Sequence, residues 1–324
     1  MDYTCILDIV DEFLFSTADT IAVGPVRLVA CLPVDIGHDT RHADVIVDVV
    51  ARSPGEAMTI AAEHFSKAVA ILDYAIFREN GDNGSESSMK HYYVAPRCDI
   101  GDGYPICAHD GGGWKEAPSN CIRMLRENAP RREPFSSPRI SCSTVAVDVH
   151  SHHVPDLIDM VFPAKPSTSK GQKTLYAAIF AATDQLHKSI RHDMYSEGRE
   201  LSLLRAITGL ESLFTPLGVG SPKAIASAVG YGAVFASLVC HTRHERLARW
   251  NRVKELYGAW GSIVSGSRTD ELSEQDVLDA RAILADSIES CIVWSDSIST
   301  VGLQEWITRR RFGCNPMTAA PDCV

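Results

Sequence analysis

With 324 residues, of which 45% are hydrophobic and 22% charged, the chain has room for about two domains of ordinary globular composition. Its apolar runs are too short to cross a bilayer and no basic leader precedes them, so we expect no membrane segment and a cytoplasmic location. Most of the net charge of −10 lies in residues 1–170, which carry 24 acidic and 15 basic side chains, and this argues against a broad phosphate-binding surface there; residues 171–312 carry 16 of each.

The ten cysteines do not form any C-x-x-C pair, and the spacing of Cys98, Cys107 and Cys121 fits no zinc template. Cysteines of cytosolic proteins ordinarily stay reduced. We therefore expect free thiols, with no metal and no other cofactor.

The first 80 residues predict an α+β unit. Val, Ile and Leu in partial alternation predict strands over residues 3–14, 26–32 and 45–50. A helix follows, because Ser53 is a good N-cap, Pro54 suits the first helical position, and Glu56 lies three residues after the cap. Such a helix can cover one face of a sheet.

Residues 79–140 are rich in Gly, Pro and small polar side chains, which predicts long loops. The stretch HDGGGW at 109–114 resembles a phosphate loop but lacks the GK[ST] ending, so we do not assign it that role. Alternating side chains at 141–149 predict another strand.

Two histidines, His150 and His152, follow that strand and are weak candidates for a metal site. If the strand continues, both imidazoles lie on one face, where Asp148 or Asp156 could join them around a metal. An exposed strand end explains the same pattern, and no third ligand stands at a fixed offset. We therefore predict no metal at this position.

The prolines and lysines of residues 162–173 mark the best domain boundary. We predict an N-terminal α+β domain over residues 1–165, an all-α bundle over 166–312 and a loose tail over 313–324. The bundle helices are expected near residues 172–195, 199–214, 221–241, 244–264 and 273–299, with Ser221 and Ser273 at the start of the third and fifth.

Two segments of the bundle carry a resemblance to a known family. The first, RAITGLESLFTP at 205–216, places Glu211 beside an apolar stripe, and the second, LYGAWGSIVSG at 256–266, contains Leu256, Tyr257 and Gly266. This succession resembles the HEPN superfamily and, within it, the ApeA-like branch, whose members carry ALE-x-L-F and later LY-x-x-RS-x-IVHG. The resemblance covers about residues 171–300 and implies a HEPN-like helical bundle that forms a dimer.

The resemblance also implies a ribonuclease chemistry without a metal, from which this chain departs. Active members carry an Arg that holds the scissile phosphate and, after four to six residues, a His that moves a proton. Trp260 and Ser265 stand at these positions, and neither an indole nor a hydroxyl can do this chemistry. No Arg lies five to seven residues before any of the 12 histidines, so we expect no catalytic residue from a shifted motif.

The basic stretch CHTRHERLARWNRVK at 240–254 has two interpretations. Together with the following loop, it offers as candidate RNA contacts Arg243, His244, Arg246 and Arg268. Alternatively, it is the solvated side of a helix that turns Val253 and Leu256 to the core, with Trp260 as a packing or dimer contact. A second basic cluster, TRRRF at 308–312, is expected to pair with acids of the N-terminal half or to touch nucleic acid.

Three functions remain open at this point. We prefer a non-catalytic HEPN-like dimerisation or regulatory protein, in the microbial antiviral or toxin-type systems to which the resemblance points, with an N-terminal domain that recognises a ligand or a protein partner. The second function is a metal-independent ribonuclease that uses non-standard residues or a site supplied by a partner. The third is a ligand or metal sensor that acts through the N-terminal domain.

Overall fold

The computed structural model describes residues 2–11, 20–30, 41–81, 99–100, 107–109, 114–116, 152–164, 169–194, 198–215, 221–266 and 272–312. The chain divides into two compact units, Met1–Ser151 and His152–Val324. This division falls ahead of the proline-rich stretch 162–173, in which the sequence analysis placed the domain boundary.

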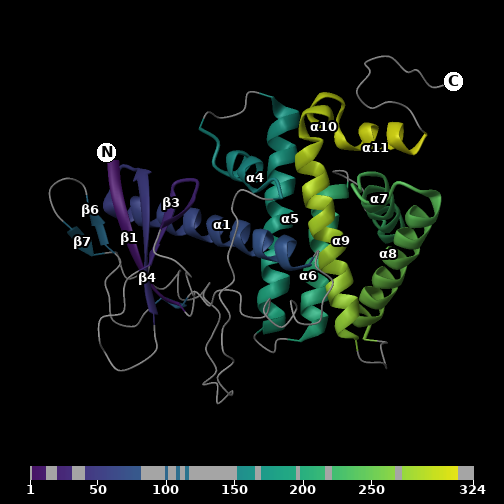
Figure 1. Cartoon of the computed structure of the whole chain (residues 1–324), viewed down its shortest axis with the longest axis horizontal. Coiled ribbons are helices and arrows are strands. Elements are labelled where there is room, and N and C mark those ends of the chain that lie inside the picture. Colours follow the sequence, from purple (N-terminus) through teal and green to yellow (C-terminus); the bar gives the residue numbers. More distant parts are fainter. Residues whose placement is uncertain are drawn as a thin grey trace. The chain divides into compact units, whose positions relative to one another are not determined.

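The first unit contains an antiparallel sheet and one long helix (Figure 1). The strands follow the order β2-β3-β4-β1-β6-β7, with β5 also paired to β1. Their bounds are β1 Asp2–Asp11, β2 Thr20–Val23, β3 Val26–Ala30, β4 Arg41–Val50, β5 Asp99–Ile100, β6 Cys107–His109 and β7 Trp114–Glu116. β1 and β4 pair along their whole length, and Val47 and Val49 of β4 are buried while Asp48 between them is exposed, which is the alternation expected of a sheet with one covered face.

Helix α1 (Pro54–Gly81) packs on this sheet and begins as the sequence predicts. The backbone N–H of Glu56 donates to Ser53 Oγ at 3.2 Å, and the backbone N–H of Arg52 donates to Glu56 Oε2 at 2.7 Å. The segment 79–140 was expected to be loop, but β5, β6 and β7 lie within it. Strands of two or three residues are too short to show a periodic pattern. The strand expected at 141–149 lies outside the described residues.

The second unit is a helical bundle built on three long helices that pack on one another (Figure 1). These are α5 (Lys170–Met194), α6 (Arg199–Phe214) and α9 (Glu274–Val293). Helices α7 (Pro222–Phe235) and α8 (Arg243–Val264) pack on each other and on α6. The shorter α4 (Val154–Val161) and α10 (Ser295–Val301) contact α5, and α11 (Leu303–Arg311) contacts α7 and α10.

The helix starts agree with the sequence prediction, whereas two ends do not. Ser221 Oγ and Ser273 Oγ each accept a hydrogen bond from a first-turn backbone N–H, as expected of N-caps. α7 ends at Phe235 rather than at residue 241, because Ser237 Oγ accepts from two following N–H groups and draws the backbone out of the helix. The last predicted helix breaks at Trp294, and residues 303–311 form a further helix that was not expected.

A buried arginine joins the three long helices. Arg281 of α9 is 0% exposed and donates from Nε to Ser189 Oγ at 3.0 Å and from Nη2 to Ser202 Oγ at 2.6 Å. Ser189 lies on α5 and Ser202 on α6, and Ser189 Oγ also donates to the Ser202 carbonyl oxygen at 2.7 Å. These bonds satisfy polar groups that would otherwise be costly inside an apolar core.

The described strands and helices make an α+β chain, as the sequence predicts. Within the part of the chain that the structure describes, no helix is both long and apolar enough to cross a membrane.

Candidate functional site

The two segments that carry the family resemblance meet where α6 packs on α8. The Tyr257 hydroxyl donates a hydrogen bond to Glu211 Oε1 at 3.1 Å, and the neighbouring Leu256 is buried. Burial raises the pKa of Glu211, although the Tyr257 hydrogen bond acts in the opposite direction. Burial and the charge of Glu211 also raise the pKa of Tyr257, so its hydroxyl stays protonated and remains a donor. We call these three residues the α6–α8 seam.

Trp260 and Ser265 are the residues that the resemblance aligns with the Arg and His of active members; Trp260 contacts this seam, and Ser265 lies at the end of α8. Trp260 packs edge-on against Tyr257, with ring centroids 5.7 Å apart, and its buried indole nitrogen has no hydrogen-bond partner among the described residues. Ser265 is the C-cap of α8 and donates from its hydroxyl to the Ser262 carbonyl oxygen at 3.2 Å. Gly266 follows in the left-handed region, at φ 65°, where glycine is favoured. Neither Trp260 nor Ser265 supplies a charge or a general base near neutral pH.

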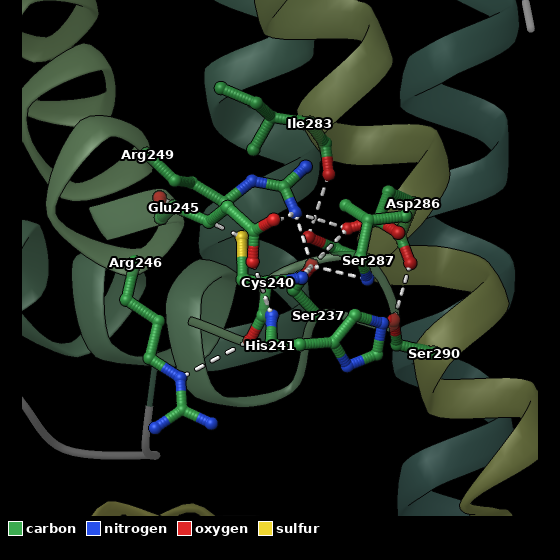
Figure 2. A network of polar contacts seen from close by, with 11 residues as sticks. Ser237, Cys240, His241, Glu245, Arg246, Arg249, Ile283, Asp286, Ser287 and Ser290 are labelled. Carbon is green, nitrogen blue, oxygen red and sulfur yellow. Dashed lines mark hydrogen bonds and ion pairs between the residues drawn. The ribbon is translucent and has the colours of Figure 1, made fainter. Parts of the chain in front are cut away.

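A buried ion pair fixes the middle of α8 to α9 (Figure 2). Arg249 Nη1 on α8 bonds Asp286 Oδ2 on α9, and the two side chains are only 11% and 5% exposed. Ser237, in the turn before α8, donates its hydroxyl to Asp286 Oδ2 at 2.9 Å and accepts from Arg249 Nη1 at 2.5 Å. Asp286 Oδ1 is buried without a described partner. One charged pair thus joins α8, α9 and the turn between α7 and α8.

Two more arginines of the basic stretch are also used within the bundle. Arg252 Nε lies 2.6 Å from Asp279 Oδ2, and Arg252 Nη2 lies 2.8 Å from Asp276 Oδ1, both in the first half of α9. Arg246 donates from Nε to the Cys240 carbonyl oxygen at 3.1 Å. The side of α8 that carries these arginines is therefore partly a packing surface, not simply a solvated face.

The remaining candidate RNA contacts lie at the start of α8 or outside the described residues. Arg243 and His244 are exposed in the first turn, between Thr242 and Glu245, which form the capping box. The backbone N–H of Thr242 donates to the Glu245 carboxylate and lowers the pKa of that group. Arg268 lies in the segment 267–271, outside the described residues.

The histidines considered for a metal site lie in or before a left-handed turn. His152 and His153 have φ of 48° and 58° and precede α4, so the expected strand does not continue through His152; His150 lies outside the described residues. His152 Nδ1 lies 3.8 Å from Glu289 Oε1, and His153 Nδ1 lies 3.0 Å from Asp156 Oδ2. Among the described residues, no group of three or more His, Cys, Asp or Glu is arranged to hold a metal ion.

Sequence reasoning did not single out Asp286 or Ser237. Asp286 stands in the run ILADSI, inside a helix that buries many apolar residues but also the polar Arg281 and Ser290. An acid at a core position of a helical pattern indicates a buried partner, and that signal was present in the sequence. Ser237 offers no comparable signal, because serines are frequent in turns of every kind.

Comparison with protein-family models, with curated proteins and with solved structures found no match. The functional assignment therefore rests on the α6–α8 seam and on the other contacts of α8.

Proposed function

We propose that this protein is a non-catalytic HEPN-like dimerisation or regulatory module in a microbial antiviral or toxin-type system, whose N-terminal α+β unit recognises a ligand or a protein partner. The HEPN assignment rests on the sequence resemblance. The hydrogen bond between Glu211 and Tyr257 supports it, because the two motif segments that the resemblance connects lie side by side. In this proposal the bundle pairs with a second copy through the face of α8 that carries Gly258 and Gly261.

The observation that carries the proposal is a pair of glycines inside α8. A Cβ added at Gly258 or Gly261 would meet no described atom within 4 Å. Glycine in a helix interior destabilises it by about 1 kcal/mol relative to alanine, so two such positions call for an explanation. A second helix that approaches the backbone closely at this face supplies that explanation.

Another glycine of the bundle shows such a close approach within the chain. A Cβ added at Gly209 of α6 would come within 2.6 Å of Leu284 of α9, so glycine there admits the neighbouring helix. No described residue plays the role of Leu284 over Gly258 and Gly261. Val264, less than one turn after Gly261, is 65% exposed. A second copy of α8 would cover this face and remove apolar area from water.

The contacts of α8 favour a non-catalytic role over the ribonuclease alternative. Trp260 and Ser265 replace the two groups that the family's reaction needs. Arg249 and Arg252 are paired with carboxylates of α9, which reduces the positive charge that this helix can offer to RNA.

Sedimentation velocity on the full chain tests the association. The wild type is expected to sediment as a dimer and the Gly261→Arg variant as a monomer, because a long charged side chain would stand in the contact. Ala282→Arg changes an exposed small residue of α9 in the same way and is the matched control, which should keep the dimer. A monomeric wild type, or the same loss in both variants, would contradict the proposal.

Incubation of the purified chain with structured and unstructured RNA in EDTA tests the non-catalytic part. We expect no cleavage of either substrate. Cleavage that disappears in the Arg243→Ala or His244→Ala variant would instead favour the metal-independent ribonuclease.

A further inference from the structure

A cluster of arginines stacked on aromatic rings lies where α7, α8 and α11 meet. The guanidinium of Arg246 on α8 lies 5.5 Å from the centroid of the Phe235 ring, and that of Arg311 on α11 lies 4.2 Å from the centroid of Tyr231. Tyr231 and Phe235 are one turn apart on α7, and their ring centroids are 6.4 Å apart. The two guanidinium groups therefore stand over neighbouring rings of the same helix.

Arg310 extends this cluster on a second pair of rings. Its guanidinium lies 5.2 Å from the centroid of Trp294 and 5.0 Å from that of Trp306. Burial lowers the pKa of Arg310, and the charge of Arg246 lowers it further, so these two side chains are within electrostatic reach of each other. We call Arg246, Arg310 and Arg311 the arginine–aromatic cluster.

No described carboxylate pairs with the arginine–aromatic cluster. Within the described ranges, Arg310 and Arg311 make cation–π contacts but no side-chain hydrogen bond or ion pair, and Arg246 adds a single hydrogen bond to the Cys240 carbonyl oxygen. Most hydrogen-bonding edges of the three guanidinium groups therefore have no partner among the described residues and can bind a ligand. A cation over a ring is stabilised by the quadrupole of the ring, but its charge is not neutralised.

Two acids close to the cluster along the chain have other partners. Glu245 accepts the backbone N–H groups of His241 and Thr242 at the start of α8. Glu305 pairs with Arg309 at 2.9 Å. The cluster thus concentrates three positive charges within a chain whose net charge is −10.

We propose that the arginine–aromatic cluster binds a diphosphate group. A guanidinium that lies face-on to a ring keeps its N–H edge free, and that planar edge matches the oxygens of a phosphate. Two guanidinium groups on neighbouring rings, with a third in electrostatic reach of Arg246, suit a compact, multiply charged anion better than a single carboxylate.

The aromatic rings do not suit a nucleobase. Arginines already lie over the rings of Tyr231, Phe235, Trp294 and Trp306, and Tyr231 also packs against Trp250 with centroids 4.9 Å apart. Single-stranded nucleic acid is usually held by bases that stack on free aromatic faces. The arrangement therefore favours recognition of phosphate, either as free pyrophosphate or as part of a nucleoside diphosphate.

Calorimetric titration of the full chain with inorganic pyrophosphate tests the site. The wild type is expected to bind, and Arg311→Gln to weaken binding by about tenfold, since one charge-assisted contact is lost. Arg309→Gln is the matched control, because it removes the same charge from α11 at a residue that pairs with Glu305. It should change the affinity less than about twofold, within the range of a screened surface charge.

A second arm identifies the source of the phosphate. Equal affinity for pyrophosphate and adenosine diphosphate assigns recognition to the phosphates alone, whereas tighter binding of adenosine diphosphate assigns a contact to the nucleoside. Arg311→Lys keeps the charge and loses the planar edge, so we expect it to bind more weakly than the wild type. Circular dichroism of each variant checks that it is folded.

Two results of the pyrophosphate titration would overturn the proposal. One is the absence of binding heat with pyrophosphate for the folded wild type. The other is an equal loss of affinity in Arg309→Gln and Arg311→Gln, which would mean a response to overall charge. An RNA oligomer that binds through Arg311 when pyrophosphate does not would also contradict it. The site is independent of self-association, so the Gly261→Arg variant should bind pyrophosphate as the wild type does.

Discussion

Replacement of Asp286 by alanine should destabilise the helical bundle strongly. Arg249 and Asp286 form an ion pair that is 11% and 5% exposed, so solvent screens it little. Removing one partner of a buried pair typically costs about 3–5 kcal/mol, because the other charge stays buried without compensation. Ser237 would also lose the acceptor of its hydroxyl hydrogen bond. We therefore expect Asp286→Ala to lose about 3–5 kcal/mol, a large share of the stability of a typical domain, about 5–15 kcal/mol.

Urea unfolding followed by tryptophan fluorescence measures this loss. Four of the five tryptophans lie in the second unit, so the signal reports mainly on the bundle; they are Trp250, Trp260, Trp294 and Trp306. Asp184→Ala is the control, because Asp184 pairs with Lys188 on α5 in a more exposed contact, 24% and 42%. Such a pair contributes about 0.3–0.5 kcal/mol.

A double-mutant cycle separates the charge pair from simple loss of packing. Arg249→Met combined with Asp286→Leu replaces the pair by apolar side chains, and it should be far less destabilising than either single change. The reasoning is wrong if Asp286→Ala loses no more stability than the Asp184→Ala control, or if the two single effects add in the double variant.

Three further outcomes follow from the contacts of α6, α8 and α9. Tyr257→Phe should destabilise the bundle by about 1 kcal/mol in urea unfolding, since the half-buried Glu211 carboxylate loses its donor; no change would mean that water replaces the hydroxyl. Burial raises the pKa of Glu211 in the folded state, so that state binds more protons, and stability falls as pH rises above the ordinary value of 4.5. Glu211→Gln should remove this decline in stability. If the stabilities of Glu211→Gln and the wild type fall in parallel with pH, this expectation is wrong. Burial, with the charge of Asp286, raises the pKa of Cys291 to about 12, so mass spectrometry should find Cys291 unalkylated until the bundle unfolds, whereas fast alkylation in the folded state would oppose its burial.

The sequence alone predicted the helix starts that are set by nearby capping residues. Ser53 and Pro54 begin α1, and Ser221 and Ser273 begin α7 and α9, because a capping side chain acts on backbone N–H groups within one turn. The end of α7 was missed because Ser237 bonds the N–H groups that follow it, and a serine near a helix end carries no fixed meaning. β5, β6 and β7 are too short for any period to be visible.

The contacts that define the candidate site were harder to predict from the sequence. Arg249 and Asp286 are 37 residues apart, and nothing in a basic stretch says which of its arginines turns inward. The aromatic contacts of Arg310 and Arg311 depend on α11, a helix that the sequence pattern did not predict. Glu211 and Tyr257 are 46 residues apart, and in the sequence only the family resemblance connected their two segments.

The dimer dissociation constant of a Gly258→Ala, Gly261→Ala double variant tests the proposed role of α8 most directly. Alanine at two open helix positions should stabilise an isolated helix by up to about 1 kcal/mol each, so any loss of association comes from the face itself. If a second helix approaches this face closely, sedimentation equilibrium should show a dissociation constant raised by about tenfold or more. An unchanged dissociation constant, or a wild type with no measurable dimer, would contradict the account.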